Sequence, residues 1–270
     1  MTQQKSVASK DGTEIAYWTS GNGPPLVLVH GTPADHTRWR PLLPYLESHT
    51  TVHAMDRRGR GGSADGVEYT LEREYEDVAA VVDAVAEGSE SAVDVYGHSH
   101  GGFCAFGAAA LTSNIRKLVL YEGWPVPNPS VFALTVEIEQ RMDELLAEGD
   151  RDGAVATMFR YYEVMSEDDL AAFRAAPSWP GRVAAAHTIT RECRAEAQAN
   201  LDAQTAAKIT VPVLLFVGER SSDPGKAQVE AVAGVLPDAR IEVLEGQDHA
   251  ADVVVPQTFS EHILAFLREG

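Results

Sequence analysis

The sequence predicts an α/β fold, in which a mostly parallel, eight-stranded sheet carries helices on both faces. Two observations lead to this prediction. Short apolar runs alternate along the chain with segments whose apolar residues recur at helical spacing. One long stretch, residues 124–207, interrupts the alternation with helical patterns only. Regular alternation of strand and helix is typical of a parallel sheet whose connecting helices cover both faces.

The expected strands are short and mostly apolar, at residues 6–9, 14–19, 25–29, 51–55, 92–96, 115–121, 211–217 and 241–244. The turn at residues 10–12 contains Asp-Gly and joins the first two strands as a hairpin. Residues 71–85 have helical periodicity, and Thr70 is placed to cap that helix. A helix rich in small residues is expected from about His100, and another after each of the last two strands.

The segment 124–207 contains no convincing strand. Its helical patterns cover residues 131–148, 154–164, 168–175 and 183–207. Because the segment falls between two strands, we expect an all-helical lid over the carboxyl edge of the sheet, inserted into a core domain of residues 1–123 and 208–270. A helical bundle that only adds bulk is the alternative.

The charge and the cysteine content limit which binding partners and which cellular compartment we expect. Forty Asp and Glu against 22 Lys and Arg give a net charge of −18. Such a surface repels nucleic acid and anionic membranes, so neither is expected as a partner. The two cysteines, Cys104 and Cys193, form no C-x-x-C pair and suit a reducing compartment. Residues 1–10 are polar, and no apolar stretch is long enough to span a bilayer, so we expect a cytoplasmic protein.

One motif carries the chemistry. Residues 97–101 read Gly-His-Ser-His-Gly, a G-x-S-x-G motif between an expected strand and an expected helix. The context matters because the bare pattern is common by chance. A side chain at Gly97 or Gly101 would collide with backbone in the sharp turn that lifts Ser99 to the mouth of the sheet. There, N–H groups of the first helical turn can stabilise an oxyanion. An incidental serine in a tight turn is the alternative.

With two further motifs, the chain resembles the α/β-hydrolase superfamily over nearly its whole length. Residues 30–33 read H-G-T-P and are similar to the family's H-G-x-P loop. Residues 56–63 match its D-x-R-G-x-G-x-S loop, and Trp39 falls where these enzymes often carry a tryptophan. The three motifs occur in the family's order. The resemblance implies the α/β-hydrolase fold and a serine-dependent hydrolase with an esterase- or lactonase-like activity.

The resemblance also implies roles for the matching residues. Ser99 would be the nucleophile, and the backbone N–H groups of Thr32 and His100 would form the oxyanion hole. His30 is expected to be a structural residue of its loop. The elbow should turn the side chains of His98 and His100 away from a position suited to a general base, although His100 could border the pocket.

The general base is expected last in chain order. His249 fits, because it follows the strand expected at residues 241–244. A serine hydroxyl is a weak nucleophile, so an imidazole must accept its proton during attack. Five other histidines are expected in surface or packing roles: His36, His49, His53, His187 and His262.

The triad acid departs from the family's common pattern. The usual Asp ends a G-x-x-D sequence after the seventh strand, but here Ser221 stands at that position and Asp223 comes two residues late. Some relatives place the acid after the sixth strand, where Glu122 ends an apolar run and needs a buried partner such as His249. Strand-end geometry favours Glu122, with Asp223 as the alternative acid.

Together these residues predict hydrolysis of a small to medium apolar carboxylic ester or lactone through an acyl-enzyme. Trp124, Tyr161 and Trp179 are candidates to line the substrate pocket. No cofactor or metal is expected, because phosphate-binding glycine motifs and clustered Cys/His ligands are absent from the sequence. A serine at the elbow argues against the Asp-dependent epoxide hydrolases and haloalkane dehalogenases. C–C bond hydrolysis, perhydrolysis, cyanohydrin cleavage and a non-catalytic ligand-binding role remain alternatives.

Overall fold

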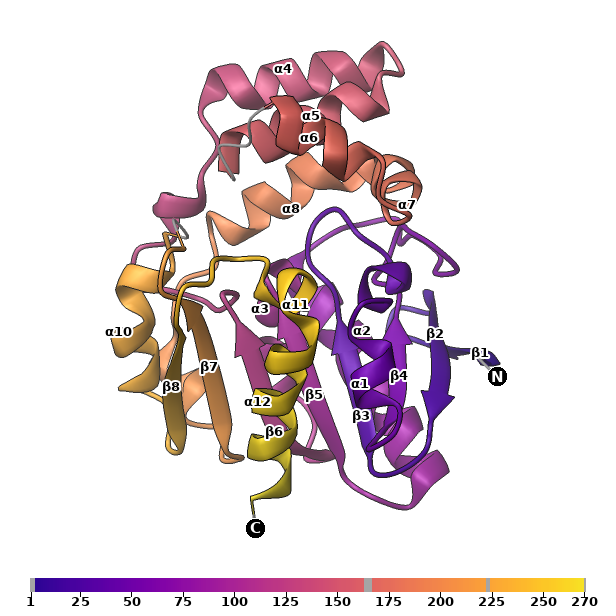
Figure 1. The fold of residues 1–270 in the computed structure, drawn as a ribbon, viewed down its shortest axis with the longest axis vertical. Helices are drawn as coiled ribbons and strands as arrows, with labels where there is room; N and C mark the ends of the chain where they lie inside the picture. Colours follow the sequence, from indigo (N-terminus) through magenta and orange to yellow (C-terminus); the bar gives the residue numbers. More distant parts are fainter. Residues whose placement is uncertain (1–2, 163–166, 222–223, 270) are drawn as a thin grey trace.

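The computed structural model describes residues 3–162, 167–221 and 224–269. Its centre is an eight-stranded sheet in the order β1-β2-β4-β3-β5-β6-β7-β8 (Figure 1). The strands are β1 Gln3–Ala8, β2 Glu14–Gly21, β3 Pro25–Val29, β4 Thr51–Met55, β5 Val93–His98, β6 Ile115–Tyr121, β7 Val213–Gly218 and β8 Ala239–Leu244. The pairs β1–β2 and β2–β4 are antiparallel and the others are parallel. The predicted sheet is confirmed.

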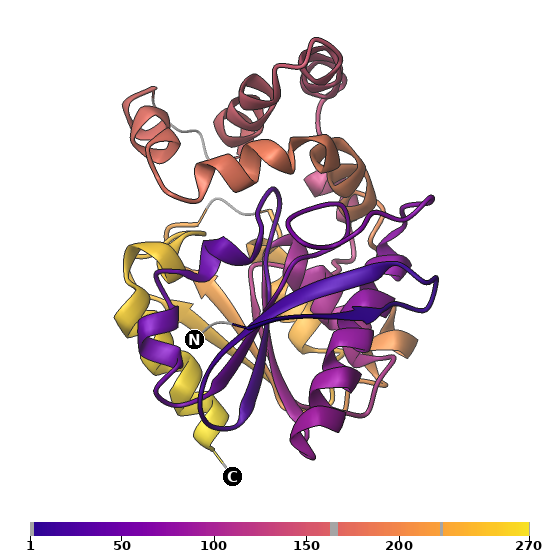
Figure 2. The same ribbon diagram turned by 90° about the vertical axis from the view of Figure 1, so that its right-hand side faces the viewer.

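Alternating side chains give the sheet two apolar faces. In β3, Val27 and Val29 join one buried cluster, whereas Leu26 and Leu28 join another. One face is covered by α2 Leu71–Ser89, α3 His100–Ala109 and α10 Val229–Ala233, and the other by α1 Leu43–Leu46 and α12 Pro256–Arg268. Figure 2 shows the sheet between these helical layers.

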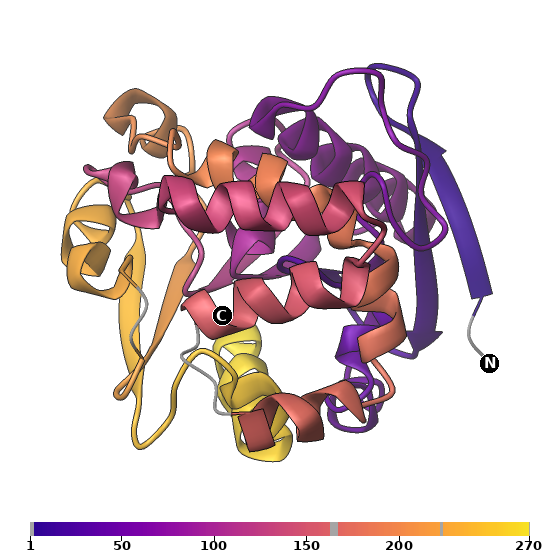
Figure 3. The ribbon, with the colours of Figure 1, turned by 90° about the horizontal axis from the view of Figure 1, so that it is seen from above.

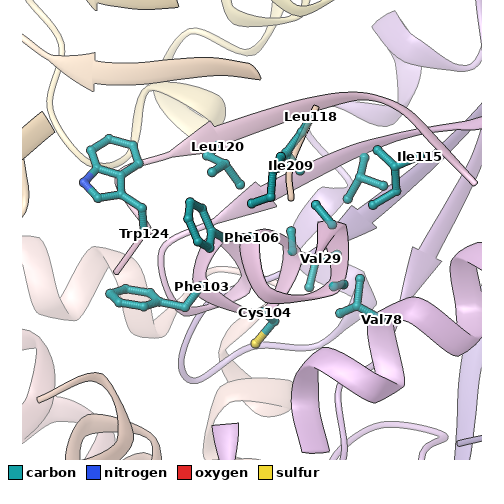
Figure 4. Packing of buried hydrophobic residues seen from close by; sticks show 14 of the residues in the cluster. Val29, Val78, Phe103, Cys104, Phe106, Ile115, Leu118, Leu120, Trp124 and Ile209 are labelled. Atoms are coloured by element: carbon teal, nitrogen blue, oxygen red, sulfur yellow. The ribbon is translucent and has the colours of Figure 1, made fainter. Parts of the chain in front are cut away.

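Helices α2 and α3 form the layer nearest the G-x-S-x-G motif. Thr70 caps α2 as expected, since its hydroxyl oxygen accepts from the backbone N–H of Arg73 at 3.3 Å. On α3, Phe106 points toward Leu120 of β6, whereas the Cys104 side chain points away from the sheet (Figure 4). This helix is buried along its whole length, which explains its small residues.

The segment between β6 and β7 forms a separate helical layer. Its helices are α4 Val136–Ala147, α5 Arg151–Tyr162, α6 Glu167–Arg174, α7 Trp179–Ala184, α8 Ile189–Glu196 and α9 Ala203–Ala206. Helices α4 to α8 lie across one end of the sheet (Figures 1 and 3). Their own apolar cluster includes Met142, Phe159 and Ile189. Within the described residues, no helix has both the length and the apolar character needed to cross a bilayer.

Two expected helices differ from the structure. The prediction of one continuous helix over residues 183–207 was wrong, because that stretch is divided among the end of α7, a 3-10 turn, α8 and α9. Asn200 instead bridges to Val126, and Asp202 starts α9 by accepting from the N–H groups of its first turn. The helix expected at residues 131–148 begins only at Val136, after the Thr135 cap. Residues 163 and 164, at the end of the helix expected at 154–164, lie outside the described residues.

Candidate active site

Ser99 lies in the sharp turn between β5 and α3. Its φ of 54° and ψ of −130° are strained for a residue with a side chain. The turn is held because the Ser99 N–H donates to the Tyr121 carbonyl at 2.9 Å, and the Gly102 N–H donates to the Ser99 carbonyl at 2.7 Å. A Cβ at Gly97 would lie 2.6 Å from the Gly101 oxygen, and one at Gly31 would lie 2.8 Å from the Ser99 Cβ. Both glycines are therefore required by close packing around Ser99.

Glu122 follows β6 directly and is buried. Its φ of 45° turns the chain sharply at the end of the strand. The carboxylate accepts three hydrogen bonds: from the Gly218 N–H at 2.7 Å, the Ser221 hydroxyl at 2.8 Å and Nδ1 of His249 at 2.6 Å. These donors lie at the end of β7, in the loop after β7 and in the loop after β8, and together they satisfy a carboxylate that would be costly to bury alone.

The loop that carries His249 is anchored on both sides of that residue. The Tyr121 hydroxyl donates to the Asp248 carbonyl and accepts from the Ala251 N–H, the latter at 3.2 Å. Nε2 of His98 donates to the His249 carbonyl at 2.9 Å, and the two imidazole rings lie 4.6 Å apart. Because His98 immediately precedes Ser99, this contact brings the His249 loop beside the elbow.

His98 is held as a neutral imidazole. Burial, together with the nearby Arg38, lowers its pKa well below the usual range. Since Nε2 donates to a carbonyl, the proton of the neutral ring lies on Nε2. Nδ1 is buried and has no hydrogen-bond partner among the described residues. His98 therefore supports the His249 loop.

The loop after β3 contains the residues of the H-G-T-P motif. Nε2 of His30 accepts from the Arg57 backbone N–H at 3.3 Å, and its Nδ1 donates to the Gly31 carbonyl at 2.9 Å. Burial, followed by Arg57 and Arg60, lowers the pKa of His30 well below its usual range. Both ring nitrogens are thus engaged within the protein, which fits the expected structural role of this histidine.

The three candidate pocket residues lie in different surroundings. Trp124 is buried in the cluster between the sheet and α3, as Figure 4 shows. Trp179 packs among the helices above the sheet and donates through Nε1 to Asp152 at 2.7 Å. Tyr161 donates to the Ala133 carbonyl at 3.4 Å. None of these contacts involves Ser99, Glu122 or His249, so their role as pocket residues stays a prediction.

A cavity of about 660 Å³ lies between α2, α3 and α8. Tyr69, Tyr75, Phe106, Arg191 and Arg194 are among its lining residues. Ser99 is not among them. Tyr69 connects this cavity to the residue that follows Ser99, because the Tyr69 hydroxyl lies 3.2 Å from Nε2 of His100.

One group of possible metal ligands occurs in the part of the chain that the structure describes: Glu74, His100 and Cys104, all buried. The Arg57 guanidinium lies 3.5 Å from a Glu74 oxygen and 3.9 Å from the Cys104 sulfur. Burial raises the pKa of the Cys104 thiol well above its usual range. A guanidinium already supplies the positive charge beside these side chains, so the group is a poor fit to a metal cation.

Sequence reasoning did not foresee three groups around the site. In the sequence, Ser221 was noted only because it stands where the usual acid would be. That position was the one feature of the sequence that could have indicated its contact with Glu122. Tyr121 and Glu192 gave no signal, since an aromatic residue in a strand and an acid in a helix are common. Glu192, on α8, accepts from the Thr32 hydroxyl. Asp223, the alternative acid, lies outside the described residues.

Comparison with known proteins defines the class to which this fold and site belong. A family model described as the alpha/beta hydrolase family matches residues 26–261. The chain belongs to this family. A crystal structure of an alpha/beta hydrolase from Sphaerobacter thermophilus is similar, with a TM-score of 0.78, 35% identity and coverage of 96% of this chain and 100% of that one.

Two curated relatives are similar over nearly their whole length. A non-heme haloperoxidase from Rhodococcus erythropolis is 27% identical over 97% of this chain and 98% of its own. A pimeloyl-[acyl-carrier protein] methyl ester esterase from Aeromonas hydrophila is 27% identical over 92% of this chain and 96% of its own. The family thus includes relatives with different reactions, and membership alone does not select among them.

Proposed function

We propose that this protein hydrolyses small to medium apolar carboxylic esters or lactones through an acyl-enzyme on Ser99. The observation that carries the proposal is the 2.6 Å hydrogen bond from His249 Nδ1 to the buried Glu122 carboxylate, in a loop that His98 ties to the elbow. A carboxylate in this position orients the imidazole and stabilises its protonated form, which is the arrangement a serine nucleophile requires.

In the first step, Oγ of Ser99 attacks the substrate carbonyl carbon while His249 takes the hydroxyl proton on Nε2. The carbonyl oxygen becomes an oxyanion, which the backbone N–H groups of Thr32 and His100 stabilise. When the tetrahedral intermediate collapses, the bond to the alkoxide leaving group breaks and His249 returns the proton to that oxygen. Glu122 stays ionised and stabilises the imidazolium throughout.

In the second step, water attacks the acyl-enzyme. His249 takes a proton from the water, the ester bond to Ser99 breaks, and the serine oxygen recovers the proton as the carboxylic acid leaves. For a lactone, the alcohol and the acid are two ends of one product.

Helices within residues 124–207 act as a lid in this proposal. A position across one end of the sheet suits a cover that excludes water from the acyl-enzyme except for the attacking molecule. The ester class is favoured by the methyl ester esterase among the relatives.

The test is hydrolysis of p-nitrophenyl butyrate by the wild-type protein and by Ser99→Ala and His249→Ala. The proposal expects release of p-nitrophenol by the wild type and loss of nearly all of it in both variants. A fluorophosphonate should label the wild type and not Ser99→Ala. An active wild type whose Ser99→Ala variant retains turnover, or an inert and unlabelled wild type, would overturn it.

A second candidate, perhydrolysis, is favoured by the full-length similarity to the non-heme haloperoxidase. Here hydrogen peroxide replaces water in the second step. Its oxygen attacks the acyl-enzyme, His249 takes the proton, and a peracid leaves as Ser99 is regenerated. Measuring peracid formed from an ester and hydrogen peroxide, against carboxylic acid formed, distinguishes the two reactions.

A further inference from the structure

Helix α8 reaches from the layer above the sheet to both residues whose backbone N–H groups would form the oxyanion hole. Glu192 accepts from the hydroxyl of Thr32, and Glu196, one turn later, lies 2.7 Å from Nδ1 of His100 through its Oε1. Helix α8 thus carries two carboxylates, and each contacts the side chain of one residue whose backbone N–H is a proposed oxyanion donor.

We propose that Glu192 is a positioning residue for the reaction, which holds the Thr32 N–H in place for the oxyanion by binding the Thr32 hydroxyl. The inference rests on the proposed function and deepens it. Glu192 does not touch the reacting atoms in this view, and its effect passes through Thr32.

The two donors differ in how much support they need. His100 is the first residue of α3, so the helix itself fixes the direction of its N–H. Thr32 lies in the loop after β3, outside any helix or strand. A donor on a loop contributes fully only when its direction is set before the charge develops. The hydrogen bond from its side chain to α8 supplies such a constraint.

Glu192 is well suited to hold a fixed charge. Its side chain is fully buried and pairs with Nη2 of Arg57 at 2.6 Å and with Arg60. Burial alone would raise its pKa, but Arg57 and Arg60 hold it well below the usual range. The carboxylate therefore stays ionised, and a charge-assisted hydrogen bond to Thr32 is stronger than a neutral one.

The same arginine links Glu192 to the rest of the loop. The backbone N–H of Arg57 donates to His30, two residues before Thr32, while its guanidinium binds Glu192. The loop after β3 is thereby held at both its histidine and its threonine. Moving α8 away would release the threonine while leaving the histidine contact in place.

The experiment uses three variants of the full chain: Thr32→Val, Glu192→Gln and the double variant. For each, kcat and KM are measured with p-nitrophenyl butyrate. Inhibition is measured with a trifluoromethyl ketone, which forms a tetrahedral oxyanion adduct with a serine. Loss of an oxyanion donor costs roughly 100- to 1000-fold in kcat, so a misdirected donor should cost about 10-fold or more.

The proposal expects kcat and inhibitor affinity to fall together in both single variants. KM should stay within about twofold, since the oxyanion is absent from the bound substrate and develops only on the way to the tetrahedral intermediate. The double variant should be no worse than the poorer single one, because both act on the same hydrogen bond: valine removes the donor, and glutamine removes the charge that strengthens it. Thr32→Ser keeps the hydroxyl and should restore kcat. If Glu192→Gln fails to fold, Thr32→Val against Thr32→Ser carries the test, because neither disturbs the buried arginines.

Asp65→Asn is the matched control. Asp65 pairs with Arg191 of α8 at 2.8 Å and 3.0 Å, so this variant weakens another contact between α8 and the core without touching Thr32. It should leave kcat within about twofold. Equal losses in Asp65→Asn, or normal kcat and inhibitor affinity in Thr32→Val and Glu192→Gln, overturn the positioning role. If the wild type itself is inert, the proposed function fails and the positioning role fails with it. If the wild type is active and depends on Ser99, but Thr32→Val and Glu192→Gln are unaffected, the positioning role alone is overturned.

Discussion

The Glu122 carboxylate lies 2.6 Å from Nδ1 of His249, although 127 positions separate the two residues in the chain. Glu122 stands at the end of β6, and His249 follows β8. The loop after β7, which supplies the acid in the family's common pattern, here supplies the Ser221 hydroxyl to the same carboxylate. Glu122 and Ser221 thus follow two neighbouring strands of the sheet.

Glu122→Gln should reduce kcat for an ester by roughly 1000- to 10,000-fold, because an amide cannot stabilise the imidazolium of His249. Asp223→Asn should leave kcat nearly unchanged. Steady-state kinetics of the two purified variants measure both effects. A large loss in Asp223→Asn with a nearly normal Glu122→Gln would move the role of the acid to Asp223.

Ser221→Ala should lower kcat by about 10-fold, since a hydrogen bond to a charged group contributes on the order of 1.5 kcal/mol. KM should change little, because the hydroxyl contacts Glu122 rather than substrate in the proposed mechanism. Ser130→Ala, which removes a surface hydroxyl that donates to Asn128, is the control. Equal activity in both variants would show that the hydroxyl does not support the acid.

The protein should become less stable as the pH is lowered, in part because of His53. Burial, and to a smaller extent Lys5, lowers the pKa of His53 to about 4. The unfolded chain has the ordinary value near 6.5, so between these values the unfolded state binds the proton more readily. The contribution of His53 to the unfolding free energy is therefore present above about pH 6.5 and is lost as the pH falls toward 4. At pH 5 the loss amounts to about 2 kcal/mol.

Urea unfolding at pH 7 and pH 5 tests this expectation. His53→Gln should lose about 2 kcal/mol less than the wild type over that interval, because glutamine does not titrate. Other buried histidines, such as His30 and His98, contribute equally to both proteins and cancel in the comparison. The same pH dependence in wild type and variant would contradict the assignment.

Trp179→Ala should act mainly on stability. Trp179 packs against Phe173 at 5.5 Å between ring centroids, and its Nε1 binds Asp152. Removing such a buried ring costs roughly 3–5 kcal/mol, measured as a lower midpoint in thermal or urea unfolding. Trp179→Phe should cost less. A variant of normal stability with a KM raised tenfold or more would instead place this tryptophan in the substrate pocket.

Much of the fold could be predicted from local patterns. All eight expected strands occur within a few residues of their predicted positions, and Thr70 caps the helix that it was expected to cap. Buried strands and amphipathic helices leave their periodicity in neighbouring residues. The division of residues 183–207 could not be predicted in this way. Its alanine-rich sequence favours a helix throughout, and the bridge from Asn200 to Val126 is a contact between distant segments.

The sequence by itself determined the strand order along the chain, the G-x-S-x-G turn and the family, because these depend on residues close together or on ordered motifs. The sequence favoured Glu122 as the partner of His249 but left Asp223 open, and only the tertiary structure showed the contact between Glu122 and His249. The contact between the Glu192 carboxylate and Thr32 came from the tertiary structure alone. Both contacts join loops or helices that the sheet and its helical cover bring together. A carboxylate's partner depends on which distant donors burial leaves within reach, and no local pattern records that distance.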